Sequence, residues 1–461
     1  MEYSIIIDRL SCIGDIYSFI TELFLLLNST DMSKHNSEYA EFCKKRTAEL
    51  HKIRTIMNLL PCVGNTDFDV WKTQWIDVLE DNKDFCKMIC YQTLMNFDLL
   101  LPDLLAQKRG VLIDNGPLNQ YSQQDALFYV TGPVSFFDKY FKDNKIRRGR
   151  QIVEHDATGL NRYFKNFFII RKSSTNDYIP TIQRYNSKVV LNEEIVVGCC
   201  PMINTPWFTA HTNQVDDTLK IQYNDNDMKD HNNRIIKIIE FFDQQKVDIV
   251  TFPELALNCA SLNEIKRFLL THELMHIKYV FTGSVWNDRR NEAYVLSKDG
   301  TVLMKYQKKK PYQMFNKIKG VYVTEDILSD AFLRFIDIPG IGRVSYNICY
   351  DYNNDDVESV CSSVMKANFM FLAVYSNDTH LMEARATTNA SIRGITTILT
   401  NSCAVADENN LICYMVRPVV VNKHLESKPI ISFRKGEPCG DCESCVKTGI
   451  ITVRDIAKPE T

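Results

Sequence analysis

Apolar residues recur at helical spacing through the first 110 residues of the chain. Steps of three and four residues place such positions on one face of a helix, so the pattern predicts amphipathic helices. The stretches that carry it are Ile5–Leu27, Tyr39–Leu60 and Val70–Leu105. Asp81 and Asn82 lie between two apolar runs and are expected to divide the last stretch. Few runs here alternate as strands do, so we expect a mainly α-helical domain over residues 1–189.

The end of this region, residues 111–188, is less regular. Gly116-Pro117 and Gly132-Pro133 are turn signals. A basic run, Lys145–Arg150, precedes an aromatic run, Tyr163–Phe168. Basic and aromatic side chains together can bind single-stranded nucleic acid. We interpret the first run instead as a solvated loop, and the second as a helix that packs its aromatic side chains inward.

Strand-like and helix-like runs alternate from residue 190 onward, which is typical of an α/β fold that contains some hairpin pairs. Polar residues at 186–188 mark the boundary, so we place a second domain at 190–461. Tyr223–Asn233 is rich in Asn and Asp and is expected to be a surface loop. The predicted runs are Glu194–Cys199, Asn232–Gln244, Val247–Phe252, Leu262–His272, Tyr279–Val285, Glu292–Ser297, Val302–Tyr306, Val344–Ile348, Phe369–Val374, Met382–Ser391, Thr396–Ser402, Leu411–Val416 and Gly449–Ile456.

One run ends at a cysteine. Val344–Ile348 predicts a strand, because its apolar residues alternate with smaller or polar ones. Residues from Asn353 onward favour a turn and the start of a helix. Cys349 therefore lies between the end of a strand and a helix N-terminus. The helix dipole stabilises negative charge there, so we expect its thiolate to be favoured.

The composition is that of an ordinary soluble protein, with 45% apolar and 24% charged residues among 461. A net charge of -3 argues against bulk electrostatic binding to nucleic acid or membrane. Ile5–Leu27 carries Asp8, Arg9, Asp15 and Glu22 and has no basic flank, so we interpret it as a buried helix and not as a signal or anchor. We expect a cytoplasmic protein with no membrane association and with 15 reduced cysteines.

Three short motifs end strand-like runs of the second domain: Phe252-Pro253-Glu254-Leu255, Tyr306-Gln307-Lys308 and Ile348-Cys349-Tyr350-Asp351. Each is weak alone, but the three in this order are specific, and on them residues 190–461 resemble the nitrilase superfamily of carbon–nitrogen hydrolases. Supporting matches are Asn291-Glu292-Ala293, Pro339–Arg343, Glu383–Ala386 and Thr396–Asn401. The resemblance implies a four-layer α-β-β-α sandwich that carries a Glu-Lys-Cys triad.

The chemistry of the three side chains agrees with that implication. Attack on an amide or nitrile carbon needs a nucleophile, a base for its proton, and a positive group for the developing negative charge. Cys349 would be the nucleophile and Glu254 the base, because burial raises the pKa of a carboxyl and makes it a better proton shuttle. Lys308 would stabilise the tetrahedral intermediate. The backbone N–H of Tyr350 is expected to share the oxyanion.

Two further assignments depend on position. The family often has a second glutamate between the lysine and the cysteine, which supports the base, and Glu325 is the best candidate by position. Lys308 is followed by Lys309 and Lys310, and such a run alone is usually a solvated face. The family's Tyr-x-Lys pattern selects Lys308, with Lys310 as the alternative.

The chain departs from the family in two places. After Tyr-Asp the family commonly continues Arg-Phe-Pro-Glu, whereas this chain reads Tyr352-Asn353-Asn354-Asp355. That region shapes the substrate pocket, so the resemblance does not identify the substrate. Residues 1–189 have no counterpart in the minimal family domain, and we interpret them as a regulatory or partner-binding domain.

Two motifs suggest metal chemistry. His272–His276 matches the His-Glu-x-x-His zinc-protease pattern, which needs both histidines on one helix face. A strand-like run follows at Tyr279, so we interpret the motif as a helix end. Cys439, Cys442 and Cys445 have the spacing of a zinc or iron–sulfur site, but a fourth ligand is missing and nothing places His424 nearby. A loop of free thiols is the favoured interpretation, with a metal site or a redox pair as alternatives.

These observations favour a cysteine-dependent hydrolase of non-peptide carbon–nitrogen bonds, with amides ahead of nitriles or carbamoyl groups, and with no cofactor. Small-molecule amides are the expected partners. The resemblance also implies a homodimer or larger homo-oligomer. The alternative is a non-catalytic or weakly catalytic dimerising scaffold whose N-terminal domain binds a protein or nucleic-acid partner. A scaffold has no need of Glu254, Lys308 and Cys349 together.

Overall fold

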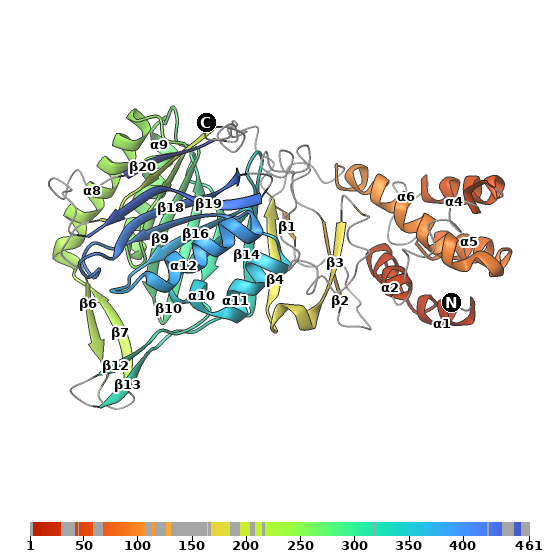
Figure 1. The fold of residues 1–461 in the computed structure, drawn as a ribbon, viewed down its shortest axis with the longest axis horizontal. Coiled ribbons are helices and arrows are strands. Elements are labelled where there is room, and N and C mark those ends of the chain that lie inside the picture. The colour runs from red at the N-terminus through yellow and green to blue at the C-terminus, as the bar shows by residue number, and fades with distance from the viewer. Residues whose placement is uncertain are drawn as a thin grey trace. The chain divides into compact units, whose positions relative to one another are not determined.

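A computed structural model describes most of the chain. The described residues are 3–28, 42–44, 46–58, 68–106, 113–115, 126–130, 164, 167–184, 194–202, 208–213, 217–316, 320–421, 424–435 and 447–452. They form two compact units, of which the first ends at Asp177 and the second begins at Tyr178 (Figure 1). Neither the basic run at 145–150 nor Cys439, Cys442 and Cys445 lie among the described residues.

The first unit is mainly helical, as predicted. Its core is aromatic: the Phe19 ring meets those of Trp71 and Trp75 edge-on, at centroid distances of 5.3 and 5.0 Å. The Trp75 indole N–H donates to Thr93 inside this core. The elements are α1 (Tyr3–Leu10), α2 (Ile16–Asn28), α4 (Thr47–Asn58), α5 (Phe68–Glu80), η4 (Lys83–Phe85), α6 (Cys86–Ala106), β1 (Ile113–Asn115), β2 (Ala126–Val130), β3 (Phe167–Arg171) and η7 (Lys172–Thr175).

Three details of this unit test the predicted helices. Ile5–Leu27 is two helices and not one, because Asp15 accepts from the backbone N–H of Ser18 and so begins α2 afresh. The predicted division at Asp81 and Asn82 is confirmed, since α5 ends just before them. The predicted helix in the aromatic run is wrong: Phe167 begins β3, which pairs antiparallel with β2. Its ring is nevertheless buried, stacked on Phe128 at 5.1 Å.

The second unit contains two large sheets. In the β15 sheet the strands from this unit lie in the order β4 (Ile179–Arg184), β14 (Phe332–Ile338), β15 (Gly342–Ile348), β16 (Phe369–Val374), β17 (Thr396–Asn401), β18 (Leu411–Val421) and β19 (His424–Arg434). In the β9 sheet the order is β11 (Val302–Gln307), β10 (Arg290–Ser297), β9 (Tyr279–Asn287), β8 (Ile249–Thr251), β5 (Glu194–Cys199) and β20 (Lys447–Thr452). The central strands β15, β16 and β17 are parallel, and so are β5, β8 and β9.

The two sheets pack face to face. Phe281 of β9 stacks on Phe371 of β16 at 3.9 Å, and the Gly283 N–H donates to the Tyr346 hydroxyl at 2.9 Å. Such central strands are buried on both faces and therefore carry near-continuous apolar runs, as β16 does with Phe-Met-Phe-Leu-Ala-Val.

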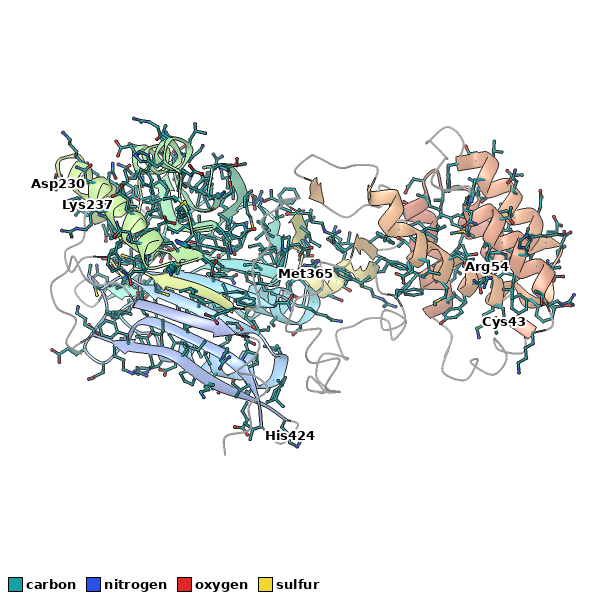
Figure 2. The ribbon with its side chains drawn as sticks, turned by 90° about the horizontal axis from the view of Figure 1, so that it is seen from above. Cys43, Arg54, Asp230, Lys237, Met365 and His424 are labelled. Atoms are coloured by element: carbon teal, nitrogen blue, oxygen red, sulfur yellow. The ribbon has the colours of Figure 1, made fainter. Side chains whose placement is uncertain are left out.

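Helices cover the outer faces of both sheets. On the β9 sheet lie α8 (Asp225–Gln244) and α9 (Cys259–Thr271), whose apolar side chains join one core with Val250 and Val280. Figure 2 shows Asp230 and Lys237 on the opposite, exposed face of α8. The β15 sheet is covered by α10 (Tyr350–Asn353), α11 (Asp355–Ser359), η8 (Val360–Val364), α12 (His380–Thr388) and η9 (Asn389–Arg393). The predicted four-layer α-β-β-α sandwich is therefore confirmed.

A small sheet extends away from the sandwich (Figure 1). It has the order β12 (Gln313–Asn316), β13 (Val321–Glu325), β7 (Thr218–Tyr223) and β6 (Phe208–Thr212). Most side chains of β12 are exposed. Its importance for the site is that Glu325 is the last residue of β13.

Two sequence predictions about this unit differ from the structure. Tyr223–Asn233 is not a surface loop, because residues from Asp225 onward belong to α8. Among the α8 side chains that the structure describes, the buried apolar ones begin at Ile235, and the mainly polar first half of the helix gave no apolar period. The second unit also begins before residue 190, since β4 pairs in parallel with β14 through six residue pairs.

Candidate active site

Cys349 lies at the junction of β15 and α10. Its backbone is held by a hydrogen bond from its N–H to the Ala373 carbonyl of β16, at 2.9 Å. Its φ of 47° and ψ of -107° are a conformation that L-residues rarely adopt, at a cost of about 1–3 kcal/mol. The sharp turn ends the strand and begins the helix. The thiol lies 3.9 Å from the carbonyl oxygen of Tyr375, and the residue is 5% exposed.

Glu254 lies in the turn that follows β8. The turn is fixed by β9: the Leu255 N–H donates to the Ser284 hydroxyl at 2.9 Å. Gly283 has a φ of 73°, and a side chain there would collide with the Pro253 carbonyl oxygen, so the strand and the turn approach closely only because this residue is glycine. The Glu254 carboxylate is buried. It accepts from the Asn291 side chain at 2.8 Å and from the Tyr375 backbone N–H at 3.1 Å.

Lys308 connects the two predicted glutamates. It follows directly on β11, and its N–H donates to the Asn291 carbonyl at 2.8 Å. Its ammonium lies 2.9 Å from Glu254 Oε1 and 2.6 Å from Glu325 Oε2. The Tyr312 backbone N–H donates to the same Glu325 oxygen at 2.8 Å. Glu325 therefore occupies the place that its position in the chain suggested, beside the lysine.

Lys310, the alternative lysine, is not in this cluster. Its ammonium lies 3.2 Å from Asp356 Oδ2, in a largely exposed pair. The backbone N–H of Tyr350, the predicted oxyanion donor, belongs to the first turn of α10, where amides have no acceptor within the helix. The Tyr350 ring is 38% exposed and meets that of Tyr312 edge-on at 6.4 Å.

The electrostatics of Cys349 differ from the sequence-based expectation. Burial raises the pKa of its thiol well above the ordinary value, and the Glu254 charge raises it further, while Lys308 opposes both. The expected effect of the helix dipole does not prevail, because α10 has only four residues and the thiol is buried. The resting group is therefore a thiol, and it becomes a thiolate only by passing its proton to a neighbour.

Glu254 is the neighbour suited to receive that proton. Burial raises the pKa of its carboxyl; Lys308 lowers it, Glu325 raises it, and a hydrogen bond with the Cys349 thiol lowers it. Burial alone would lower the pKa of Lys308, but the two glutamates raise it well above its ordinary value. The lysine is therefore positively charged, and two carboxylates share its single charge.

Several residues of this cluster were missed or underused by the sequence reasoning. Tyr375 supplies both its backbone N–H to Glu254 and its carbonyl to Cys349. The position of Tyr375 in the sequence could have indicated its role. Tyr375 directly follows β16, and Cys349 directly follows β15, which is the neighbouring parallel strand. The carboxyl ends of parallel strands lie at one edge of a sheet. Asn291 was noted only as a motif match, yet it orients the Glu254 carboxylate.

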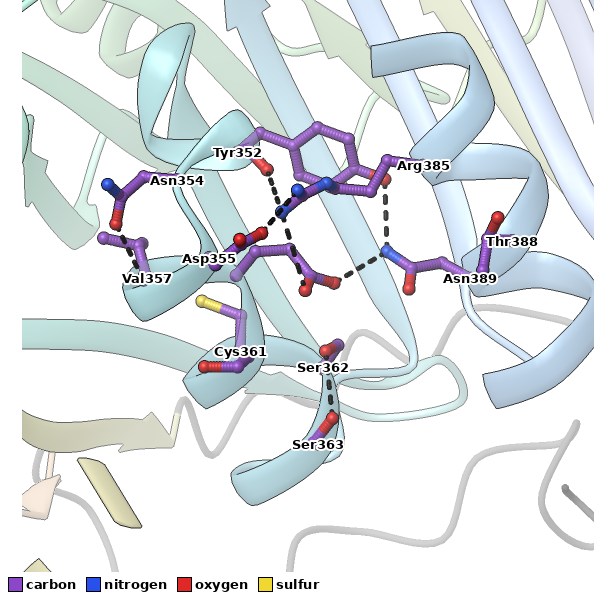
Figure 3. A network of polar contacts seen from close by, with 12 residues as sticks. Tyr352, Asn354, Asp355, Val357, Cys361, Ser362, Ser363, Arg385, Thr388 and Asn389 are labelled. Carbon is purple, nitrogen blue, oxygen red and sulfur yellow. Dashed lines mark hydrogen bonds and ion pairs between the residues drawn. The ribbon is translucent and has the colours of Figure 1, made fainter. Parts of the chain in front are cut away.

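A second polar network lies beyond the cysteine turn (Figure 3). Glu358 of α11 lies 3.2 Å from Arg393 Nη1 and 3.8 Å from Arg385 Nη1, and it accepts from the Asn389 amide at 3.0 Å. Asn389 also donates to the Tyr352 hydroxyl at 3.2 Å. The network ties α10 and α11 to α12 and η9, and Arg385 of the Glu383–Ala386 stretch takes part in it.

The His272–His276 motif gains no support as a metal site, and the Cys439, Cys442 and Cys445 motif lies outside the described residues. His272–His276 follows the last residue of α9, so the two histidines do not share a helix face, in agreement with the predicted helix end. Among the described residues, no three His, Cys, Asp or Glu side chains are grouped to hold a metal ion. In the same part of the chain, no helix is both long and apolar enough to cross a membrane.

Comparisons with known proteins found similarity in structure but not in sequence. No protein-family profile and no curated protein matches the chain. Nit3 of Saccharomyces cerevisiae, a member of branch 10 of the nitrilase superfamily, shares 13% identity over 59% of this chain and 94% of its own, with a TM-score of 0.40. The NitFhit protein of C. elegans shares 14% over 57% of this chain and 62% of its own, with a TM-score of 0.40.

An amidase also appears among the similar structures. The amidase of Nesterenkonia sp. AN1, in a form with the acetamide moiety of fluoroacetamide added at its active-site cysteine, shares 13% identity with this chain. The alignment covers 59% of this chain and 95% of the amidase, with a TM-score of 0.36. Nit3 and the Nesterenkonia amidase are both described as members of the nitrilase superfamily.

Proposed function

We propose that this protein is a hydrolase of non-peptide carbon–nitrogen bonds, with amides as the preferred class, that acts through a thioester on Cys349. The observation that carries the proposal is the buried cluster itself. Glu254 and Glu325 both lie within hydrogen-bonding distance of the Lys308 ammonium, and Glu254 also interacts with the Cys349 thiol. Buried charge is costly, so a fold retains such an arrangement beside a nucleophile most readily where the charges serve chemistry.

The first half of the proposed reaction forms the thioester. Glu254 takes the proton of the Cys349 thiol as the sulfur attacks the carbonyl carbon, and the carbonyl electron pair moves to oxygen. The Lys308 ammonium and the Tyr350 N–H stabilise that oxyanion. Glu254 then passes its proton to the leaving nitrogen, the C–N bond breaks, and ammonia or an amine departs.

The second half returns the enzyme to its resting state. Glu254, again ionised, takes a proton from a water molecule that attacks the thioester carbonyl. The C–S bond breaks, the thiol regains its proton, and a carboxylic acid leaves. Glu325 and Asn291 hold Lys308 and Glu254 in place through both halves, since each donates to or accepts from one of them.

The test is intact-protein mass spectrometry after incubation with amides, ureas and nitriles, and separately with iodoacetamide. We expect a covalent adduct or turnover that disappears in Cys349→Ala. Cys361→Ala is the matched control, because Cys361 is another buried thiol but contacts the Asn347 amide oxygen instead of a glutamate. No adduct with any compound, together with a Cys349 that iodoacetamide does not alkylate in the folded protein, would contradict the proposal and favour a scaffold.

A further inference from the structure

The side chains of the proposed triad come from both sheets. Cys349 follows β15 of one sheet, whereas Lys308 follows β11 of the other. Hydrogen bonds within a sheet therefore do not set the distance between the ammonium and the thiol. Some contact between the sheets has to do so, because a reacting group misplaced by about 1 Å can lose about 100-fold in rate.

Asp351 makes such a contact. It lies two residues after Cys349, and its carboxylate accepts from the backbone on the far side of Lys308. The Lys309 N–H lies 3.0 and 2.9 Å from the two carboxylate oxygens, and the Lys310 N–H lies 2.8 Å from one of them. The Tyr306 hydroxyl donates to Oδ2 at 2.9 Å. The donors thus stand on both sides of Lys308 in the chain.

The burial of Asp351 makes these bonds strong and selective. The residue has no exposed surface, and a buried carboxylate without partners is costly. Hydrogen bonds to an ionised group are about twice as strong as neutral ones. The carboxylate only accepts, and all three of its partners donate, so no other side chain of this size satisfies them equally.

We propose that Asp351 is a positioning residue that ties the cysteine turn to the segment 306–310 and thereby sets the distance between Lys308 and Cys349. This inference rests on the proposed function of the same cluster. Asp351 does not touch the reacting atoms. It acts through the backbone on which Lys308 stands, and through the two-residue link that joins it to Cys349.

A purely structural role is the competing explanation, and Asp330 provides the control for it. Asp330 pairs with the Lys309 ammonium and with Arg334, close to the same segment, but the atoms it binds there belong to side chains. Asp330→Asn therefore removes a charge near Lys309 without releasing the backbone beside Lys308. Tyr306→Phe removes one of the donors to Asp351 and leaves the others.

The experiment measures the rate constant for alkylation of Cys349 by iodoacetamide as a function of pH, with the site assigned by peptide mass spectrometry. Circular dichroism and thermal melting show whether each variant is folded. We expect Asp351→Asn to slow alkylation by about 100-fold, Tyr306→Phe by a few-fold, and Asp330→Asn not at all. In the two slower variants the pH profile moves to higher pH, because Lys308 no longer lowers the pKa of the thiol as effectively.

Interpretation of the profile must include every titratable or charged group near the carboxylate. Those that interact with Asp351 are Tyr178, Tyr306, Lys308, Lys309 and Cys361. Near neutral pH Lys308 is charged and the tyrosines and the Cys361 thiol are neutral, while burial lowers the pKa of Lys309. Burial raises the pKa of Asp351 itself to about 6, so profiles are compared above that value.

The outcomes separate this inference from the proposed function. A folded Asp351→Asn variant with the wild-type rate and profile overturns the positioning role and leaves the proposed function intact. A wild-type Cys349 that does not react at any pH contradicts the proposed function instead. If Asp351→Asn does not fold, Tyr306→Phe decides: a slower rate with a profile displaced to higher pH supports the inference, and wild-type behaviour overturns it.

Discussion

Two buried ion clusters in the second unit can be compared directly. In the proposed catalytic cluster, Lys308, Glu254 and Glu325 have side chains that are 1%, 3% and 8% exposed. In the helix cluster around Glu358, of which Figure 3 labels Arg385 and Asn389, the Glu358 side chain is 6% exposed, but its partners Arg385 and Arg393 are 17% and 26% exposed. The first cluster has two carboxylates for one cation, and the second has two cations around one buried carboxylate.

The difference shows how a proposed catalytic cluster can be distinguished from an ion network that only stabilises the fold. In the helix cluster, water reaches the arginines and stabilises their charge, so the network can simply hold α11 against α12 and η9. The proposed catalytic cluster is buried, it has two carboxyl groups for one ammonium, and the Cys349 thiol lies beside it. Burial strengthens every charge interaction in the cluster. The pKa values of Glu254, Lys308 and Cys349 are all raised there. Buried ion pairs alone do not mark a site, whereas perturbed pKa values beside a buried thiol favour one.

The largest expected effect comes from removing the shared cation. Lys308→Met should slow formation of the Cys349 adduct by about 100- to 1000-fold, because the oxyanion loses its charged donor. It should also lower the free energy of unfolding by about 3–5 kcal/mol, because two buried carboxylates lose their partner. Adduct kinetics and urea denaturation measure the two effects. An adduct rate within threefold of wild type would remove Lys308 from the mechanism.

Replacing the base should separate activity from stability. Glu254→Gln should abolish adduct formation. In wild type, the rate should fall as pH is lowered through the raised pKa of Glu254, with a midpoint above 4.5. Because that pKa is raised in the folded state, the stability contributed by the protonated form is present below pH 4.5 and is lost as pH rises through the folded-state pKa.

Glutamine resembles the protonated form and does not undergo this loss. The melting temperature of Glu254→Gln minus that of wild type should therefore increase with pH across the same window. Paired thermal melts from about pH 4 to about pH 8 measure the difference. A difference that stays constant or decreases over this range would show that the ionised carboxylate is not strained in the folded state.

In the helix cluster, a substitution should reduce stability but leave the reactivity of Cys349 nearly unchanged. Glu358→Ala should lower the free energy of unfolding by about 3 kcal/mol, because two arginines and the Asn389 amide lose their acceptor. At temperatures where the variant is folded, alkylation of Cys349 should stay within about threefold of wild type, since Glu358 pairs with Arg385, Arg393 and Asn389 and not with a side chain of the proposed triad. If alkylation of Cys349 slowed by more than the loss of folded protein explains, Glu358 would also be needed for the reactivity of Cys349.

The smallest effect is expected at Lys310. Its pair with Asp356 is largely exposed, and such pairs contribute less than about 1 kcal/mol. Lys310→Ala should leave both the unfolding free energy and the adduct rate nearly unchanged. This variant is the matched control for Lys308→Met, because both remove one ammonium from the same run of three lysines. If both variants lost the same amount of adduct rate, the choice of Lys308 over Lys310 as the lysine of the proposed triad would have to be revised.

Local patterns in the chain were sufficient for the central elements of the fold. The strand at Val344–Ile348 and the one at Phe369–Val374 could be predicted, because buried strands carry apolar runs of recognisable length. The first half of α8 could not, since the side chains that it buries include the polar residues His231 and Asn232 and so give no apolar period. The exposed strands β12 and β13 were also missed, because a hairpin with few buried side chains has no alternation to detect.

The sequence by itself determined which residue types stand at the ends of three strands. Its resemblance to the family's Tyr-x-Lys pattern favoured Lys308 over Lys310, and the family's second glutamate suggested Glu325 by position. Only the tertiary structure decided that Tyr375 and Asn291 orient Glu254, and that Asp351 reaches across the sheets to Tyr306 and Lys310. It also reversed the expectation for the Cys349 thiol. The physical reason is that burial and charge act through distances in space, and separation along the chain does not specify these distances when the groups belong to different sheets.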